Sequence, residues 1–188
     1  MEKRDLIELC RSSQDENKTR DENPRHHRIV CAIRNNPALA GINNSECAFA
    51  EVSLSHDYVF SRVSSGVFEC GDVSIGICSD YKNLRVIGRT YLSPDVIVFG
   101  KDDKVSLIEV KTEENRNVPN WEKYGNRFIR GVEMFMRAVG LNRIDACLYF
   151  SLADGSVNTY RTNAFIDSGK FGFNRDWKIR RRGLERVE

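Results

Sequence analysis

Residues 93–111 read SPDVIVFGKDDKVSLIEVK. Two apolar runs flank a short charged loop at 101–103, and this arrangement predicts two antiparallel strands joined by a tight hairpin connection. Three charged residues interrupt the apolar pattern: Asp95, Glu109 and Lys111. They are either the solvated edge of an ordinary hairpin or a functional cluster that the hairpin holds in place.

The length of the hairpin loop decides between these two interpretations. Side chains alternate between the faces of a strand, so Glu109 and Lys111 lie on the same side, about 7 Å apart. If Gly100 pairs with Lys104, Asp95 lies directly opposite Glu109, with their Cβ atoms about 5 Å apart. A two-residue loop would shift the register by one residue and send the two carboxylates to opposite faces. The sequence therefore permits the cluster without establishing it.

Two carboxylates that face each other destabilise a sheet unless a cation lies between them. Hard oxygen ligands favour Mg²⁺ or Mn²⁺. Such an ion binds a phosphodiester oxygen and lowers the pKa of a bound water. Lys111 can position that water and offset the charge that develops on the phosphate. Asp95, Glu109 and Lys111 therefore predict metal-dependent hydrolysis of phosphodiester bonds.

Hydrophobic periodicity along the chain predicts a single α/β domain with a mixed central sheet flanked by helices. The expected elements are a helix at 3–11, a polar loop at 12–28, a short helix at 28–35, an amphipathic helix at 45–63, several strands between 67 and 111, a long helix at 120–139, a strand at 144–152 and its hairpin partner at 157–162. We divide the chain into an N-terminal helix and polar loop (1–44), a core (45–165) and a basic C-terminal tail (166–188).

Composition narrows the classes of protein. With 188 residues, 40% hydrophobic and 30% charged, the chain has the composition of one folded globular domain. No apolar run approaches about 20 residues, so we expect no transmembrane helix. The first residues are too charged for a secretory signal, and we expect an intracellular protein. The six cysteines contain no CxxC pair, which argues against structural zinc and favours reduced thiols.

Basic residues supply candidate contacts to phosphate groups, although the net charge is only +2. Residues 174–188 hold six basic and three acidic side chains around one tryptophan. The polar face of the 120–139 helix is also basic. Solvated surface charge is the alternative reading of both segments. The candidates are Lys123, Arg127, Arg130, Trp177, Lys178, Arg180, Arg181 and Arg182.

Pro94-Asp95, followed by Glu109-Val110-Lys111 on the next strand, resembles the signature of the PD-(D/E)XK nuclease superfamily. The resemblance covers about 45–152, and the layout is similar to that of archaeal Holliday-junction resolvases. It implies a restriction-endonuclease-like fold and a Mg²⁺- or Mn²⁺-dependent endonuclease acting on duplex or branched DNA, with a homodimer as the expected assembly. In that reading Asp95 and Glu109 bind the metal and Lys111 assists the attacking water.

The superfamily usually adds a carboxylate from the first helix of the core. Glu46 and Glu51 are both candidates, and we prefer Glu46 as a further metal ligand because it lies at the edge of the helix's predicted apolar face. His56 falls on that apolar face. Some viral cap-snatching endonucleases of the superfamily use a helical histidine, although a hydrogen-bonded structural His56 is the simpler interpretation. His26 and His27 fall in the polar loop and read as surface residues.

One departure bears on the activity. RecB-type exonucleases of the superfamily carry a glutamine on the helix after the lysine, and no glutamine follows Gln14 here. The missing glutamine argues against exonuclease activity. Three alternatives to a DNA endonuclease stay open: a catalytically inactive nucleic-acid-binding protein of the same fold, an RNA endonuclease of the cap-snatching type, and an interaction domain with a charged surface hairpin.

Overall fold

The structure is a computed structural model and describes residues 2–14, 23–52, 68–70, 73–75, 94–113, 121–174 and 180–183. The helices are α1 (Lys3–Ser13), α2 (Pro24–Asn35), the 3-10 helix η1 (Pro37–Ala40) and α5 (Trp121–Val139). The strands are β1 (Ser45–Ala50), β2 (Phe68–Cys70), β3 (Val73–Ile75), β4 (Val96–Gly100), β5 (Val105–Glu113), β6 (Arg143–Leu152), β7 (Ser156–Asp167), β8 (Lys170–Phe173) and β9 (Arg180–Gly183).

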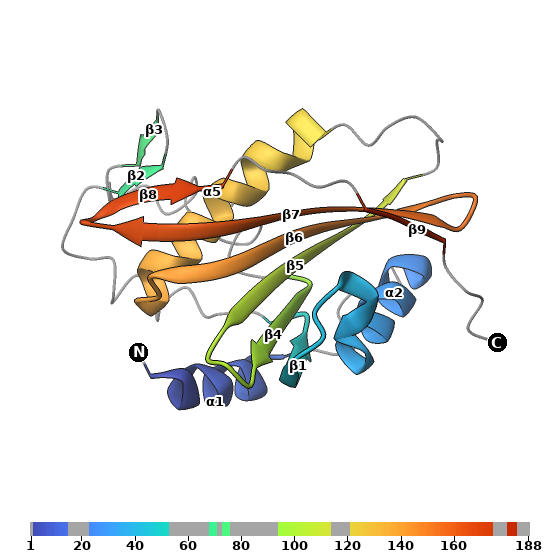
Figure 1. Ribbon diagram of the computed structural model, residues 1–188, viewed down its shortest axis with the longest axis horizontal. Coiled ribbons are helices and arrows are strands. Elements are labelled where there is room, and N and C mark those ends of the chain that lie inside the picture. Colours follow the sequence, from blue (N-terminus) through green and yellow to red (C-terminus); the bar gives the residue numbers. More distant parts are fainter. Residues whose placement is uncertain are drawn as a thin grey trace.

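A mixed seven-stranded sheet is the centre of the molecule (Figure 1). Its order is β1-β4-β5-β6-β7-β8, and β9 also pairs with β7. The β5–β6 pair is parallel and the other pairs are antiparallel. Helix α5 follows β5 and precedes β6, as expected for a parallel pair that needs a crossover connection. The predicted α/β class with a mixed sheet is confirmed. Strands β2 and β3 pair with each other in a separate two-stranded sheet.

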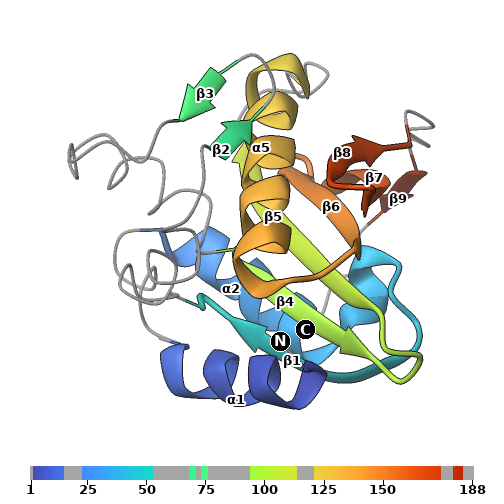
Figure 2. The same ribbon diagram turned by 90° about the vertical axis from the view of Figure 1, so that its left-hand side faces the viewer.

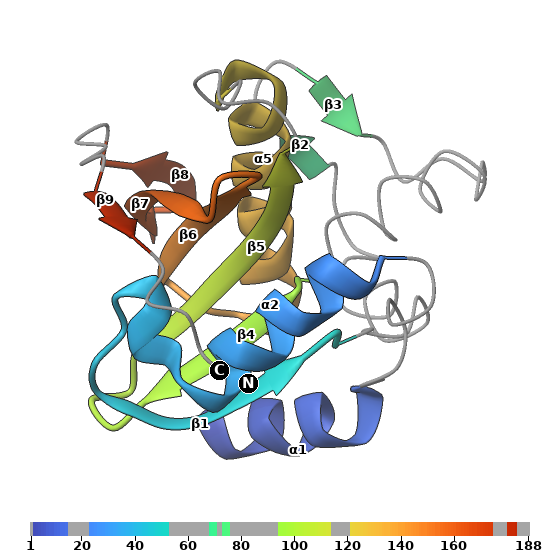
Figure 3. The ribbon, with the colours of Figure 1, turned by 90° about the vertical axis from the view of Figure 1, so that its right-hand side faces the viewer.

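Helices cover both faces of the sheet. Figure 2 shows α5 in front of the sheet with α2 behind it, and the view from the opposite side in Figure 3 reverses them. Side chains from alternate positions of β4 and β5 supply the two cores: Ile97 and Leu107 pack on the α5 side, and Val98 and Ile108 on the α2 side. Strand β4 is therefore buried along its whole length.

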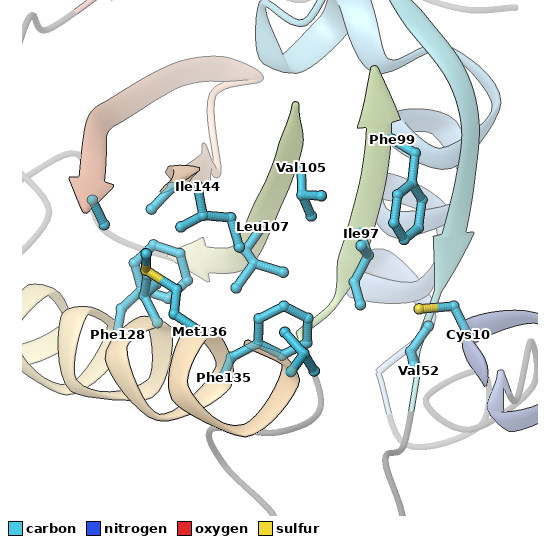
Figure 4. Packing of buried hydrophobic residues seen from close by; sticks show 14 of the residues in the cluster. Cys10, Val52, Ile97, Phe99, Val105, Leu107, Phe128, Phe135, Met136 and Ile144 are labelled. Carbon is cyan, nitrogen blue, oxygen red and sulfur yellow. The ribbon is translucent and has the colours of Figure 1, made fainter. Parts of the chain in front are cut away.

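The α5-side core explains why the predicted helix at 120–139 forms (Figure 4). Phe128, Val132, Phe135, Met136 and Val139 recur at helical spacing and are all buried. Helix α1 completes this core, and Figure 4 shows its Cys10 beside Val52, which follows β1. The α5 contacts fix the helix against the sheet whose strand β5 carries Glu109 and Lys111.

The helix predicted at 45–63 is wrong at its start, where residues 45–50 form strand β1. Cys47 and Phe49 contact the α5-side core while Ala48 and Ala50 contact the α2-side core, which is the alternation of a strand. Apolar residues on both faces conceal this alternation in the sequence, because a strand buried on both sides does not alternate in polarity. Residues 53–63 lie outside the described residues.

Two further boundaries differ from the prediction. The polar loop expected at 12–28 is wrong for 24–28, because α2 already begins at Pro24. Residues 166–188, predicted as a basic tail, contribute the end of β7, strand β8 and strand β9. The basic segment is therefore joined to the sheet through β9, which pairs with β7.

Among the described residues the free thiols are Cys10, Cys31, Cys47 and Cys147. Burial raises the pKa of Cys10 and of Cys147 to about 12. These two side chains are therefore neutral thiols that act as core residues.

Candidate functional site

The loop between β4 and β5 sets the register that the sequence left open. Gly100 N donates to Lys104 O over 2.7 Å, and Val96 pairs with Ile108. Asp103 has a φ of 59°, the left-handed conformation that closes a three-residue hairpin connection. The three-residue loop is therefore confirmed. Asp95 immediately precedes Val96 and Glu109 immediately follows Ile108, so this register directs Asp95 toward Glu109.

Asp95 is held rigidly at the start of β4. Its side-chain Oδ2 accepts a hydrogen bond from Val110 N over 2.6 Å, and the residue is only 8% exposed. Val96 and Ile108 are the last residue pair between β4 and β5 at this end. The Asp95 carboxylate thus accepts the hydrogen bond of a β5 backbone N–H that lies just beyond that pair. The second oxygen, Oδ1, faces the imidazole of His26.

Glu109 and Lys111 form an ion pair between Oε1 and Nζ on one face of β5. Burial and the nearby charge of Asp95 raise the pKa of Glu109 to about 7, against the opposing effect of Lys111. Burial lowers the pKa of Lys111, but the carboxylates of Glu109 and Asp95 outweigh it and raise that pKa overall. The pair thus combines a carboxyl that titrates near neutral pH with an ammonium that stays charged.

Glu51 follows the last residue of β1 and adopts a strained backbone conformation. Its φ is 50°, in the left-handed region, which costs a non-glycine residue about 1 kcal/mol. Its backbone N donates to Asp95 O over 2.9 Å, and the residue is 3% exposed. The bend brings this buried carboxyl to the same end of the sheet as Asp95.

His26 reaches these carboxylates from the first turn of α2. Its Nε2 lies 3.3 Å from Asp95 Oδ1 and 3.8 Å from Glu51 Oε1. The N-cap Asn23 accepts from His26 N and thereby fixes the start of the helix. Burial lowers the pKa of His26, but the hydrogen bond and charge of Asp95, together with Glu51, outweigh it and raise that pKa.

His26, Glu51 and Asp95 form a buried group that can hold a metal ion. One ligand atom from each lies within 4.8 Å of the others. Two ligands on an ion with bond lengths near 2.1 Å are about 3–4 Å apart, and the two separations measured from His26 Nε2 fall in that range. The donor set of one imidazole and two carboxyls therefore fits a divalent cation, and in the described part of the chain this is the group that does so.

Glu46, the sequence-based choice for the third carboxylate, lies elsewhere. It pairs with Lys3 Nζ at 2.8 Å and its side chain is 50% exposed. Glu46 is near the start of β1, where Ser45 pairs with Gly100. Asp95 is at the opposite end of the β1–β4 pair, where Ala50 pairs with Val96. The preference for Glu46 over Glu51 rested on a helix, and the strand reverses it.

The candidate nucleic-acid contacts are only partly placed. Lys123, Arg127 and Arg130 belong to α5, and Arg180, Arg181 and Arg182 belong to β9. Trp177, Lys178 and His56 lie outside the described residues. These contacts remain predictions from the sequence.

His26 is the candidate site residue that the sequence interpretation missed, because the predicted polar loop places it at the surface. Asn23-Pro24 is a helix-start signal, with an N-cap residue followed by proline at the first helical position. A helix that begins at Pro24 puts His26 four residues before Val30 and seven before Ile33, both of them buried. That spacing would have placed His26 on the buried face.

Comparison with protein-family models, with curated proteins and with solved structures found no match. Among the described helices, none has the length and hydropathy of a membrane span.

Proposed function

We propose that this protein is a metal-dependent nuclease that hydrolyses phosphodiester bonds in DNA and has a restriction-endonuclease-like core. The observation that carries the proposal is the convergence of five side chains: His26, Glu51, Asp95, Glu109 and Lys111. The edge of a solvated hairpin would leave its carboxylates exposed, whereas Asp95 is buried and the side chain of Glu109 is only 16% exposed. Buried carboxylates this close together call for a compensating cation, which the protonated His26 supplies without metal and a bound ion would supply in its place.

The proposed cofactor is Mn²⁺ or Mg²⁺. Carboxylate oxygens suit both ions, whereas the imidazole of His26 suits Mn²⁺ better than Mg²⁺, which prefers oxygen ligands throughout. We therefore expect the site to bind Mn²⁺ more tightly than Mg²⁺.

The five side chains divide into two functional groups. His26, Glu51 and Asp95 would hold the ion, which when bound polarises a phosphate oxygen and acidifies a water. Lys111 offsets the negative charge that develops on the phosphate as the nucleophile attacks. Glu109 can accept the proton of the attacking water, because a pKa of about 7 lets it work as a base near neutral pH.

An RNA endonuclease of the cap-snatching type is the second candidate, and His26 favours it. A histidine supplied by a helix beside the acidic cluster is the feature expected for that type of enzyme, and His26 comes from α2. The same five side chains would serve on either substrate, because hydrolysis of a DNA or an RNA phosphodiester needs the same charge stabilisation.

Cleavage assays test both candidates together. Supercoiled, linear and four-way-junction DNA and single-stranded RNA are incubated with Mn²⁺, Mg²⁺ or EDTA. We expect metal-dependent cleavage by the wild type and its loss in Lys111→Ala, which keeps the metal-binding group intact. Binding of nucleic acid without turnover in any metal would leave only the inactive binding protein, and cleavage that survives Lys111→Ala would refute the assigned site.

A further inference from the structure

The ammonium of Lys111 contacts both a carboxylate and an aromatic ring. Its Nζ pairs with Glu109 Oε1 and also lies over the Tyr124 ring, 5.9 Å from the ring centre. Tyr124 comes from the first turns of α5 and is half-buried. The distance is within the range at which a ring face attracts a cation.

The Tyr124 ring is itself held by other rings. It packs against Phe150 with the ring centres 5.9 Å apart, and Phe150 meets Tyr160 edge-on at 5.5 Å. Phe150 is also the register partner of Lys111 across the parallel β5–β6 pair. The aromatic row of Tyr124, Phe150 and Tyr160 therefore lies beside the lysine on a fixed part of the sheet.

A lysine side chain needs such support at a reaction centre. Its four-carbon stem is flexible, and its ammonium is a compact charge that burial disfavours. The carboxylate of Glu109 attracts the ammonium but leaves it free to swing around that oxygen. A second contact with the face of a ring restricts the swing and partly replaces the lost hydration.

We infer that Tyr124 is a positioning residue that holds the Lys111 ammonium in the orientation used for catalysis through the face of its ring. The inference rests on the proposed nuclease function and adds to it a residue from α5, outside the signature on β4 and β5. The ring face, and not the hydroxyl, is the group to which we assign this role.

Two substitutions separate the ring from the hydroxyl. Tyr124→Leu keeps an apolar side chain without a ring face, and we expect kcat to fall roughly 3- to 30-fold, the range of a partly desolvated cation–π contact. The KM for the nucleic acid and the Kd for Mn²⁺ should stay within about twofold. Tyr124→Phe should restore kcat. Phe171→Leu removes an aromatic ring that packs on the α5-side core from β8, outside the aromatic row, and is the matched control that lowers Tm without lowering kcat.

An NMR measurement tests the contact independently of activity. In ¹H–¹³C spectra the Lys111 ε-methylene signal, assigned by its absence in Lys111→Arg, should be displaced upfield by the ring current. The displacement should persist in Tyr124→Phe and vanish in Tyr124→Leu.

The outcomes distinguish the two hypotheses. No metal-dependent cleavage by the wild type would overturn the proposed function and with it the positioning role. Cleavage by the wild type with an unchanged kcat in Tyr124→Leu, or with equal losses in the Leu and Phe variants, would overturn the positioning role alone. An undisplaced ε-methylene signal in the wild type would do the same.

Discussion

Glu109 carries a charge that the folded protein disfavours. Burial and Asp95 raise its pKa to about 7 from an ordinary 4.5. A carboxyl with a raised folded-state pKa contributes stability that is fully present below about 4.5 and is lost as the pH rises through about 7. The same shift suits the residue to proton transfer near neutral pH.

Glu109→Gln should therefore change how stability depends on pH. In EDTA we expect the wild type to lose about 1–3 kcal/mol of unfolding free energy relative to the variant between pH 4.5 and pH 8. Urea denaturation at several pH values measures the difference. Parallel curves for the two proteins across that window would contradict the shifted pKa.

His26 supplies the only nitrogen in the metal-binding group, so it should determine the choice of metal. We expect His26→Ala to weaken Mn²⁺ binding by about 10- to 100-fold and Mg²⁺ binding by less, because Mg²⁺ prefers oxygen. His27→Ala is the matched control, since His27 contacts Cys31 on the same helix. Calorimetric titration with each ion measures both effects, and equal losses in the two variants would refute the assignment.

At the scale of elements, the β4–β5 hairpin determines where the charged side chains lie. The stretch at 93–111 allowed its two strands and their hairpin connection to be predicted, but it permitted two registers, and the three-residue loop of the structure selects the one that extends Asp95 toward Glu109. Strand β1 could not be predicted, because a strand buried on both faces lacks alternation. That single error moved the choice of carboxylate from Glu51 to Glu46.

Shortening the hairpin tests the role of the register. Deletion of Asp102 leaves a two-residue loop, which shifts β4 by one residue and turns its side chains to the opposite faces. Ile97 and Phe99 would leave the α5-side core, so we expect a large drop in Tm and loss of metal-dependent cleavage. Thermal melts and cleavage assays measure this.

Asp102→Asn is the control for the deletion, because it keeps the loop length and removes only the exposed ion pair with Lys104. It should retain both Tm and cleavage. A deletion variant with the wild-type Tm and cleavage rate would show that the loop does not set the register.

At the scale of the whole molecule, the sheet joins distant segments of the chain around one site. Helix α2, the end of β1, the β4–β5 hairpin and α5 each contribute a side chain to it or support one. The sequence revealed the acidic pair and the lysine because they share one hairpin. It did not reveal His26 or select Glu51, because their proximity depends on how α2 and β1 pack on the sheet.

The arginines of β9 allow a test of nucleic-acid binding at this scale. Replacement of Arg180, Arg181 and Arg182 by glutamine should weaken nucleic-acid binding at low salt. It should also reduce the slope of log K against log salt by up to about 2–3, because each phosphate contact releases counterions. Fluorescence anisotropy across a salt series measures the slope. An unchanged slope would show that β9 makes no phosphate contact.

The most direct test of the metal site is calorimetric titration of Mn²⁺ into the wild type, Glu51→Gln and Glu46→Gln. The two glutamates are matched, since they lie near opposite ends of β1 and only Glu51 lies with His26 and Asp95. We predict that the wild type and Glu46→Gln bind Mn²⁺ with the same affinity and that Glu51→Gln binds at least about tenfold more weakly. A wild type that binds no Mn²⁺, or a loss of binding in Glu46→Gln but not in Glu51→Gln, would contradict the site.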